Sequence, residues 1–452
     1  MSFLNELIIV EFILFLLTIL ITNFDFNSPG TCSITIFFFA TLLLKLVENS
    51  WKIVLSGYCF FVITVGLAMI VVAEFVATKT TIKRSLIKNR KQDNAFITTV
   101  NTHIQKSLVC LSVILMAIYV VEIMSKGQGI GATGLSSIGA VANSMSNGTE
   151  RLSIVGKIAF QYCTLIPYPF CWLFSKLSAD KKNNNGKNWI NLIPICSGII
   201  VQFFCANRHN ILRIIFAFTI CYYHSIRKEN RISRQKRRKI IIRMVLLFLG
   251  FCILFYIVRD IVKVSSHSIP FVEYFIYYLS SPIVLFSKYL DSPNSVRAAS
   301  NLWGETCFTG LYSTLARWGL VDNVNVITNH TVIGGTSGIR TGNTYTFFMR
   351  PYHDFGLNGV IIFTLIVFMI ACISYHKVVT KDSWSIKSYR NKMMTTIFFG
   401  YFYYVFPIAV TDFYITIESK IMNIAYLAII CIICNLMIKI SYKKSISGEE
   451  LR

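Results

Sequence analysis

The sequence has few charged residues, and acidic residues are the scarcer kind. Only 14% of the 452 residues are Asp, Glu, Lys or Arg, with 21 acidic against 44 basic side chains. Hydrophobic residues make up 54% of the chain, and the mean hydropathy is +0.58. This composition excludes an intrinsically disordered chain and a disulfide-stapled secreted domain. It predicts an all-α polytopic membrane protein.

The familiar nucleotide, metal and hydrolase motifs are also missing. The chain has no Walker A sequence, no GxGxxG after a strand, no HExxH, no GxSxG and no Asp-x-Asp. These absences disfavour a nucleotide-driven pump, a common soluble hydrolase and a metal-dependent nucleotide-sugar site, so we expect no metal and no other cofactor. The CxxC pair Cys431 and Cys434 lies inside an apolar run, where packing is a better explanation than zinc or redox chemistry.

Eleven apolar stretches approach the roughly 20 residues that a helix needs to cross a membrane. The first has no basic flank and contains Glu6 and Glu11, so we expect an uncleaved helix and not a signal peptide. The predicted spans are 3–21, 31–47, 53–76, 107–124, 157–178, 189–206, 210–225, 241–258, 357–376, 393–410 and 421–438.

Nearly all of the excess positive charge follows alternate predicted spans. Segments 78–106, 179–188, 226–243, 377–392 and 439–452 carry net charges of +6, +2, +8, +4 and +2, which is +22 of the formal +23. The positive-inside rule places all five segments in the cytoplasm. We interpret this charge as a topology signal with affinity for anionic headgroups and not as a nucleic-acid site, because no aromatic platform or binding fold surrounds it.

This topology divides the chain into three parts. Residues 1–258 hold spans one to eight, residues 259–356 form one long external loop, and residues 357–452 hold spans nine to eleven and a cytoplasmic C-terminus. The loop is nearly neutral, with seven basic and six acidic residues. Within it, the apolar and aromatic stretch Ile269–Leu290 predicts a helix in the membrane interface. A crossing there would put the basic segments on different sides.

Positive charge is sparse on the external side, so its arginines are candidate functional residues. Arg208 lies between spans six and seven, and Arg213 follows inside span seven. The alternative for both is an interfacial arginine whose head group reaches water. The long loop adds Arg297, Arg317, Arg340 and Arg350.

Residues 340–356 concentrate polar and aromatic groups directly before span nine. They include two Arg, one His, one Asp, two Tyr and several Thr. An arginine fork matches phosphate oxygens, Asp and Asn bond to sugar hydroxyls, and Tyr stacks on sugar faces. The stretch therefore predicts a site for a phosphate beside sugar hydroxyls, and the alternative is a polar cap on a membrane helix.

Other groups on this side are further candidates. Residues 301–306 and 317–318 supply aromatic and acidic side chains, for which an amphipathic surface helix is an equal alternative. His330 and Asp412 are acid/base candidates.

The sequence resembles the O-antigen polymerases (Wzy-type) of the oligosaccharide repeat unit polymerase family. The resemblance covers the layout of the whole chain and one motif, Asn-x-Tyr-x followed by Asp-Phe-Gly-x-x-Gly, which begins here at Asn343 and Tyr345 and ends at Asp354–Gly359. The turn at Asn207-Arg208 is similar to the family's arginine between adjacent spans. Related ligases often carry His directly before the motif's Asn, where this chain has Gly342.

The resemblance implies a GT-C-like architecture and a metal-independent glycosyltransferase of the bacterial inner membrane. Such an enzyme joins undecaprenyl-pyrophosphate-linked oligosaccharide repeat units into O-antigen or a related surface polysaccharide at the periplasmic face, in lipopolysaccharide biosynthesis. The implied partners are the lipid-linked oligosaccharide, membrane lipids, a chain-length regulator and a flippase, without nucleic acid. An O-antigen ligase and a polysaccharide flippase or other secondary transporter are the alternatives.

We expect catalysis from four residues. Arg208 and Arg350 would meet the charge on the departing pyrophosphate, and Asp354 or His353 would position or deprotonate the attacking hydroxyl. The expected substrate-binding residues are Arg317, Arg340, Asn343, Tyr345 and Tyr352.

Overall fold

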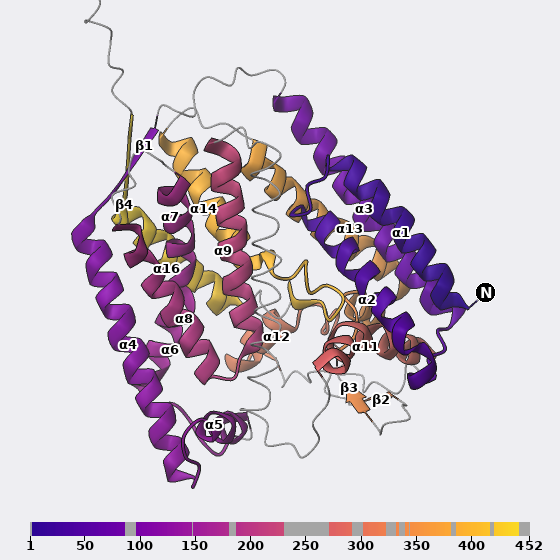
Figure 1. The fold of residues 1–452 in the computed structure, drawn as a ribbon, viewed down its shortest axis with the longest axis horizontal. Helices are drawn as coiled ribbons and strands as arrows, with labels where there is room; N and C mark the ends of the chain where they lie inside the picture. The colour runs from indigo at the N-terminus through magenta and orange to yellow at the C-terminus, as the bar shows by residue number, and fades with distance from the viewer. Residues whose placement is uncertain are drawn as a thin grey trace, which may run out of the picture. The chain divides into compact units, whose positions relative to one another are not determined.

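The computed structural model is mainly helical (Figure 1). It describes residues 2–85, 96–146, 148–179, 187–229, 271–291, 302–321, 331–333, 340–342, 344–380, 386–415 and 420–442.

The chain forms two compact units, each assembled from segments that are distant in sequence. Unit 1 comprises Met1–Ile82, Ser265–Lys377 and Phe402–Ala425, and unit 2 comprises Lys83–Val264, Val378–Tyr401 and Tyr426–Arg452. These units differ from the three consecutive parts predicted from the sequence, whose boundaries follow residues 258 and 356. Each unit contains residues from all three parts.

Unit 1 is built on four long apolar helices. Its elements are α1 (Phe3–Ile21), α2 (Pro29–Trp51), α3 (Gly57–Ser85), α11 (Phe271–Asp291), α12 (Thr309–Arg317), β2 (Thr331–Ile333), β3 (Arg340–Gly342) and α13 (Met349–Thr380), whose last residues belong to unit 2. Pro29 suits the first position of α2, where its missing N–H needs no partner. Helices α1 and α2 pack together, and the ring of Phe37 in α2 contacts that of Phe348 beside α13.

Helix α11 runs across α2, as Figure 1 shows by viewing α11 nearly end on. Every residue from Ser280 to Ser287 is buried. The Ser280 hydroxyl donates to the Ala40 carbonyl (2.8 Å), and the Ser56 amide donates to Ser287 Oγ (3.1 Å). The helix predicted at 269–290 is confirmed as α11, and its place in the membrane interface stays a prediction.

Unit 2 is mainly helical and includes a two-stranded ribbon. Its elements are β1 (Phe96–Val100), α4 (Thr102–Gly129), α5 (Ser136–Ser146), α6 (Ile154–Leu165), α7 (Pro167–Ala179), the 3-10 helix η3 (Lys187–Asn191), α8 (Leu192–Phe204), α9 (Arg208–Glu229), α14 (Ile386–Tyr403), α16 (Ile421–Met437) and β4 (Ile438–Tyr442). The ends of α14 and α16 that adjoin 402–425 belong to unit 1. Buried Tyr119, Ile123, Val141, Ala159, Cys163 and Val201 form a core between α4, α5, α6 and α8.

Two predicted spans of unit 2 have a different local structure. The stretch 157–178 forms two helices, α6 and α7, which meet at Ile166. Pro167 begins the second helix, because its ring suits a helix start and cannot continue the ladder of α6. In the stretch 393–410, α14 ends at Tyr403 and residues 404–411 form turns.

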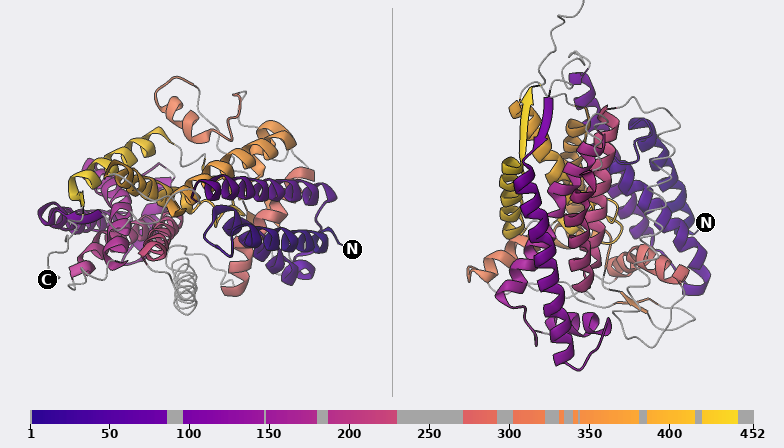
Figure 2. Two further views of the ribbon diagram at one scale, coloured as in Figure 1. Left: turned by 90° about the horizontal axis from the view of Figure 1, so that it is seen from above. Right: turned by 60° about the vertical axis from the view of Figure 1, so that its left-hand side comes forward.

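A two-stranded ribbon joins the ends of unit 2 (Figure 2). Strand β1 pairs antiparallel with β4, from Phe96 opposite Tyr442 to Val100 opposite Ile438. Asn101 then caps α4 by accepting the amide hydrogens of His103 (3.2 Å) and Ile104 (3.3 Å). The strands lie in basic segments 78–106 and 439–452, so their pairing agrees with both segments being on one side of the membrane.

Five helices in the described part of the chain are long and apolar enough to cross a membrane. They are Phe3–Ile21, Pro29–Trp51, Gly57–Thr81, Thr102–Gly129 and Met349–Val378. The prediction of a helical, multi-pass membrane protein is confirmed at this level. The predicted span 241–258 lies outside the described residues, and the total of eleven spans stays a prediction.

Candidate functional site

Two glycines shape the chain where the polar stretch enters α13. Gly356 has φ 61° and ψ −152°, a conformation open essentially only to glycine, and it divides α13 into a short first segment and a long second one. A Cβ at Gly359 would lie 2.1 Å from the carbonyl oxygen of Pro351, so the two segments touch at their backbones. Residues 350–354 therefore stand in a short segment folded against the long helix.

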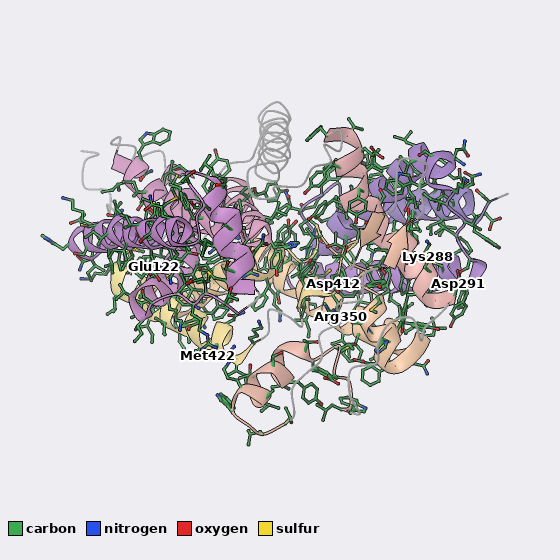
Figure 3. The ribbon with its side chains drawn as sticks, turned by 90° about the horizontal axis from the view of Figure 1, so that it is seen from below. Glu122, Lys288, Asp291, Arg350, Asp412 and Met422 are labelled. Atoms are coloured by element: carbon green, nitrogen blue, oxygen red, sulfur yellow. The ribbon has the colours of Figure 1, made fainter. Side chains whose placement is uncertain are left out.

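Arg350 and Asp412 form a buried ion pair in unit 1 (Figure 3). Arg350 Nε donates to Asp412 Oδ1 and Nη2 donates to Oδ2, both at 2.8 Å, which is the bidentate geometry that suits an arginine fork. Nη1 lies 3.4 Å from both the Thr306 carbonyl oxygen and Thr309 Oγ1. Arg350 is only 5% exposed. A carboxylate thus occupies the edge of the guanidinium that was expected to meet pyrophosphate.

Asp354 holds the turn that precedes α12. Its Oδ1 accepts hydrogen bonds from the Thr306 hydroxyl (2.8 Å) and the Thr306 amide (3.4 Å), and its Oδ2 accepts from the Cys307 amide (2.7 Å). The Thr306 hydroxyl also lies 3.2 Å from the Arg350 carbonyl oxygen. Asp354 and Arg350 therefore contact the same turn, and Asp354 has a clear structural role there.

His353 meets a tyrosine that the sequence reasoning did not select. Tyr289, in α11, places its hydroxyl 2.8 Å from His353 Nδ1. The second ring nitrogen, Nε2, has no hydrogen-bond partner among the described residues. Burial, and then the charges of neighbouring residues such as Tyr352 and Asp354, raise the pKa of the Tyr289 phenol above its usual value. Tyr289 therefore stays protonated near neutral pH and can hold the imidazole in place.

Aromatic rings cluster around Tyr289, the partner of this histidine. The Tyr289 ring lies 6.2 Å from that of Tyr345 and 6.3 Å from that of Tyr352, centroid to centroid. The Tyr352 hydroxyl donates to that of Tyr58 (3.1 Å). Tyr345 is buried, whereas Tyr352 and His353 are partly exposed. Of the two tyrosines expected to bind sugar, Tyr352 is the better placed.

The other expected residues lie on other elements of the described structure or outside it. Arg317 is exposed at the last position of α12, and Arg340 stands in β3 opposite Ile333. Arg208 is the first residue of α9 in unit 2. Asn343 lies outside the described residues, as do Arg297, Asn301 and His330.

Arg213 is buried in unit 2 and is not an arginine whose head group reaches water. It is 3% exposed, its Nη1 donates to the Tyr401 hydroxyl (3.1 Å), and its guanidinium carbon lies 4.8 Å from the Tyr401 ring centroid. Stacking on a phenol ring keeps a guanidinium away from water at tolerable cost.

A second polar cluster lies inside unit 1, at Glu74 of α3. This fully buried carboxylate accepts hydrogen bonds from the Ser28 hydroxyl (2.6 Å) and the Gly30 amide (3.0 Å). His376 Nε2 lies 2.7 Å from Oε1, and Cys372 Sγ lies 3.1 Å from Oε2. Both Glu74 and His376 fall within candidate spans, where ionisable residues are rare and commonly functional.

Sequence reasoning named Asp412 as an acid/base candidate but missed its pairing with Arg350, and it missed Tyr289 altogether. The signal available for Tyr289 was its place at the end of an apolar aromatic helix close to the polar stretch. Comparison adds no further assignment, because no protein-family model, no curated protein and no solved structure matches the chain.

Proposed function

We propose that this membrane protein is an O-antigen polymerase of the Wzy type. It would be a metal-independent glycosyltransferase with a GT-C-like architecture in the bacterial inner membrane. Its substrates would be undecaprenyl-pyrophosphate-linked oligosaccharide repeat units, joined at the periplasmic face.

One observation carries the proposal. The half of the motif that the structure describes in full, Asp354–Gly359, forms a bent, partly buried polar site, in which His353 and Asp354 stand beside the Arg350–Asp412 pair. A partly exposed histidine with one ring nitrogen held by Tyr289 is suited to bind or move a proton at the other nitrogen. Such a group beside tyrosines and a membrane helix suits a lipid-linked sugar acceptor.

The reaction assigns different roles to these residues. A hydroxyl of the acceptor repeat attacks the anomeric carbon of the donor, the bond from that carbon to pyrophosphate breaks, and the hydroxyl proton passes to His353 Nε2 when Nδ1 carries the other proton. Asp354 and the Arg350–Asp412 pair maintain the structure of the site, since their hydrogen bonds are made within the chain. Arg208 and Arg340 remain the cations proposed for the pyrophosphate.

Complementation of a deletion strain tests the assignment, with protein levels checked for each variant. We expect Arg208→Ala, Arg350→Ala and His353→Gln to lose long-chain polysaccharide. Lys288→Ala removes an exposed charge from α11 and should leave it intact. Unchanged long-chain polysaccharide in both arginine variants would overturn the proposed roles of those arginines.

The lipopolysaccharide made by the deletion strain distinguishes a polymerase from a ligase and from a flippase. Loss of a polymerase leaves a core capped by a single repeat unit. Loss of a ligase leaves no capped core and strands polymer on the carrier lipid. Loss of a flippase leaves neither capped core nor periplasmic polymer.

Transport is a second candidate function, favoured by the buried Glu74–His376 pair. Ionisable groups inside candidate spans are typical of transporters and proton relays. The variant Glu74→Gln keeps the shape of the side chain and removes its charge. If the chain is a transporter, this variant should lose both capped core and polymer at normal protein levels. A polymerase should still give a capped core.

A further inference from the structure

Helix α12, in unit 1, has the reverse of the polarity that a helix on a water-facing surface has. Its buried positions carry small or hydroxyl side chains, namely Thr309, Gly310 and Thr314. On the opposite side, at spacings of four and three residues, lie Leu311 and Trp318, which are exposed, and Leu315, which is partly exposed. A surface helix in water turns its apolar stripe toward the protein core. The reversal therefore indicates that something other than water covers the outer side of α12.

The chain on either side of α12 is exposed in the same way. Between residues 302 and 321, the exposed positions are Trp303, Leu311, Arg317, Trp318, Gly319 and Leu320. Four of them are large and apolar, and we call these four, Trp303, Leu311, Trp318 and Leu320, the α12 patch. Trp303 is 70% exposed and Leu320 is 67% exposed. Such a group of exposed apolar side chains, with Arg317 as its only exposed charge, is typical of a surface that binds a membrane or another protein.

A row of aromatic rings connects the α12 patch with helix α13. The ring centroid of Trp303 lies 5.0 Å from that of Phe355 and 5.9 Å from that of Phe308. The ring centroid of Phe363 lies 5.3 Å from that of Phe355 and 5.8 Å from that of Phe308. Phe363 belongs to the candidate span Met349–Val378. The α12 patch is therefore continuous with a helix that is long and apolar enough to cross a membrane.

The exposed side of that span is apolar next to the row of rings. Isoleucines occupy three exposed positions of α13, one turn apart, at Ile362, Ile366 and Ile370. The first two of them flank Phe363 on the helix surface, at one and three residues from it. In a membrane-spanning helix, such an exposed apolar row faces lipid.

Hydrogen bonds fix α12 at the first end of α13. Asp354 accepts from the Thr306 hydroxyl at 2.8 Å and from the Cys307 amide at 2.7 Å, in the turn that leads into α12. Arg350 Nη1 lies 3.4 Å from Thr309 Oγ1, within α12 itself. Both partners stand before Gly356, where the long segment of α13 begins. The α12 patch is thus held at the level where this candidate span meets the membrane surface, which the predicted topology makes the external surface.

We propose that the α12 patch inserts into the external leaflet of the membrane, at the boundary between headgroups and acyl chains. Tryptophan is favoured at this depth, and the leucines extend toward the acyl chains. Arg317, at the last position of α12, is exposed and can extend its guanidinium to lipid phosphates. Lipid accounts for the patch better than a second copy of the chain, because the patch continues into the exposed surface of a candidate span.

This insertion places the polar site around Asp354 at the level of the headgroups, since the turn at Thr306 and Cys307 joins the site to the patch. It does not depend on the polymerase assignment, because it rests on the polarity of α12 and on its attachment to α13.

The test measures the fluorescence of single tryptophans in the purified full-length protein. The protein is placed in nanodiscs of phosphatidylcholine, whose two faces are both open to solvent, with either ordinary or brominated acyl chains. Iodide in the buffer is the quencher from the water side. Subtracting the emission of W303F or W318F from that of the wild type isolates each tryptophan. The matched control is W51F, because Trp51 lies in the same unit and is only 4% exposed.

We expect brominated lipid to quench Trp303 and Trp318 at least about twofold more than Trp51, because the apolar face of an interfacial helix lies roughly 5–10 Å inside the headgroup boundary. Iodide should quench them no more than it quenches Trp51. The variant L311E/L320E puts two carboxylates into the α12 patch and should lower the quenching of Trp318 by brominated lipid at least about twofold, since charge is disfavoured among acyl chains. L311M/L320M keeps the patch apolar and should behave as the wild type.

Stronger quenching of both tryptophans by iodide than by brominated lipid would place the patch in water and overturn the proposal. Protection from both quenchers would also overturn it, because protein, such as a second copy of the chain, would then cover the patch. Trp318 decides the question alone if W303F does not fold, since Trp318 is exposed at the end of α12.

Discussion

The Arg350–Asp412 pair is bidentate and largely buried, and variants of it can distinguish a structural role from a catalytic one. Removal of one partner leaves an uncompensated charge, so Arg350→Ala and Asp412→Ala should each lower the free energy of unfolding by about 3 kcal/mol. The apolar double variant R350M/D412L leaves no orphan charge and should recover most of that loss. Thermal unfolding in detergent measures both effects.

Polysaccharide chain length then decides the role of Arg350. If R350M/D412L restores stability but not long-chain polysaccharide, the guanidinium takes part in the reaction. If it restores both, Arg350 acts only by holding the start of α13 to the chain around Asp412.

Tyr289 positions His353, and its hydroxyl is testable without removing the ring. Tyr289→Phe deletes the 2.8 Å hydrogen bond to Nδ1 and leaves the aromatic packing in place. We expect the rate of polymerisation from lipid-linked repeat units to fall about tenfold, the worth of one well-placed hydrogen bond. When Tyr289→Phe is added to the H353Q variant, the rate of polymerisation should not fall further, because the two residues act together. An equal additional loss in H353Q would contradict the link between them.

Cys307 reports on the turn that Asp354 holds, independently of any activity. The thiol is fully buried, and burial, followed by the nearby Asp354 carboxylate, raises its pKa above the usual value. Little thiolate forms at pH 8, so folded protein should resist alkylation at Cys307, while denatured protein is labelled fully. Asp354→Ala removes the acceptor of the Cys307 amide and should expose the thiol. Peptide mass spectrometry after labelling measures this change.

At the scale of the element, the bend in α13 depends on Gly356 and Gly359. Alanine at Gly356 meets an unfavourable backbone conformation, and alanine at Gly359 collides with the Pro351 carbonyl, so each should cost about 1–3 kcal/mol of stability. Gly400 is the matched control, since a Cβ there has ordinary contacts no closer than 3.6 Å. Gly400→Ala should be neutral or slightly stabilising in the same unfolding measurement.

Element prediction from the sequence succeeded where one local signal was sufficient. Long apolar runs correctly predicted helices at α1, α2, α3, α4 and α13, and the aromatic run at 269–290 correctly predicted α11. The break between α6 and α7 was missed, because hydropathy averaged over the whole run conceals a proline that starts a new helix. The β1–β4 ribbon was missed because its strands are short and distant in sequence.

The candidate site was predictable only in part, for a related reason. The polar stretch before span nine was visible in the sequence, and it contains Arg350, His353 and Asp354. Asp412 lies 62 residues from Arg350 and Tyr289 lies 64 residues from His353, so no local pattern announces either contact. A count of charges also cannot show that a carboxylate neutralises an arginine. For that reason Arg350 was expected to be a free cation and is found in an ion pair.

At the scale of the whole molecule, the net charge predicts a topology that reporter fusions can test. Five basic segments hold +22 of the formal +23, and two sets of contacts inside the units are consistent with this arrangement. Thus β1 and β4, from two of the basic segments, pair with each other. Glu74, near the predicted inner end of α3, contacts Gly30 at the start of α2 and His376 near the end of α13.

Fusions of a periplasm-dependent phosphatase and of a cytoplasm-dependent fluorescent protein should therefore give opposite signals along the chain. We expect fluorescence without phosphatase activity for junctions at 184, 235, 384 and 452, and the reverse for junctions at 295 and 325, because lysine and arginine near the ends of spans set orientation. Phosphatase activity at 235 together with fluorescence at 325 would place the long loop inside the cell. That outcome would remove the proposed chemistry from the periplasm, so a single set of fusions tests a premise on which the proposed function depends.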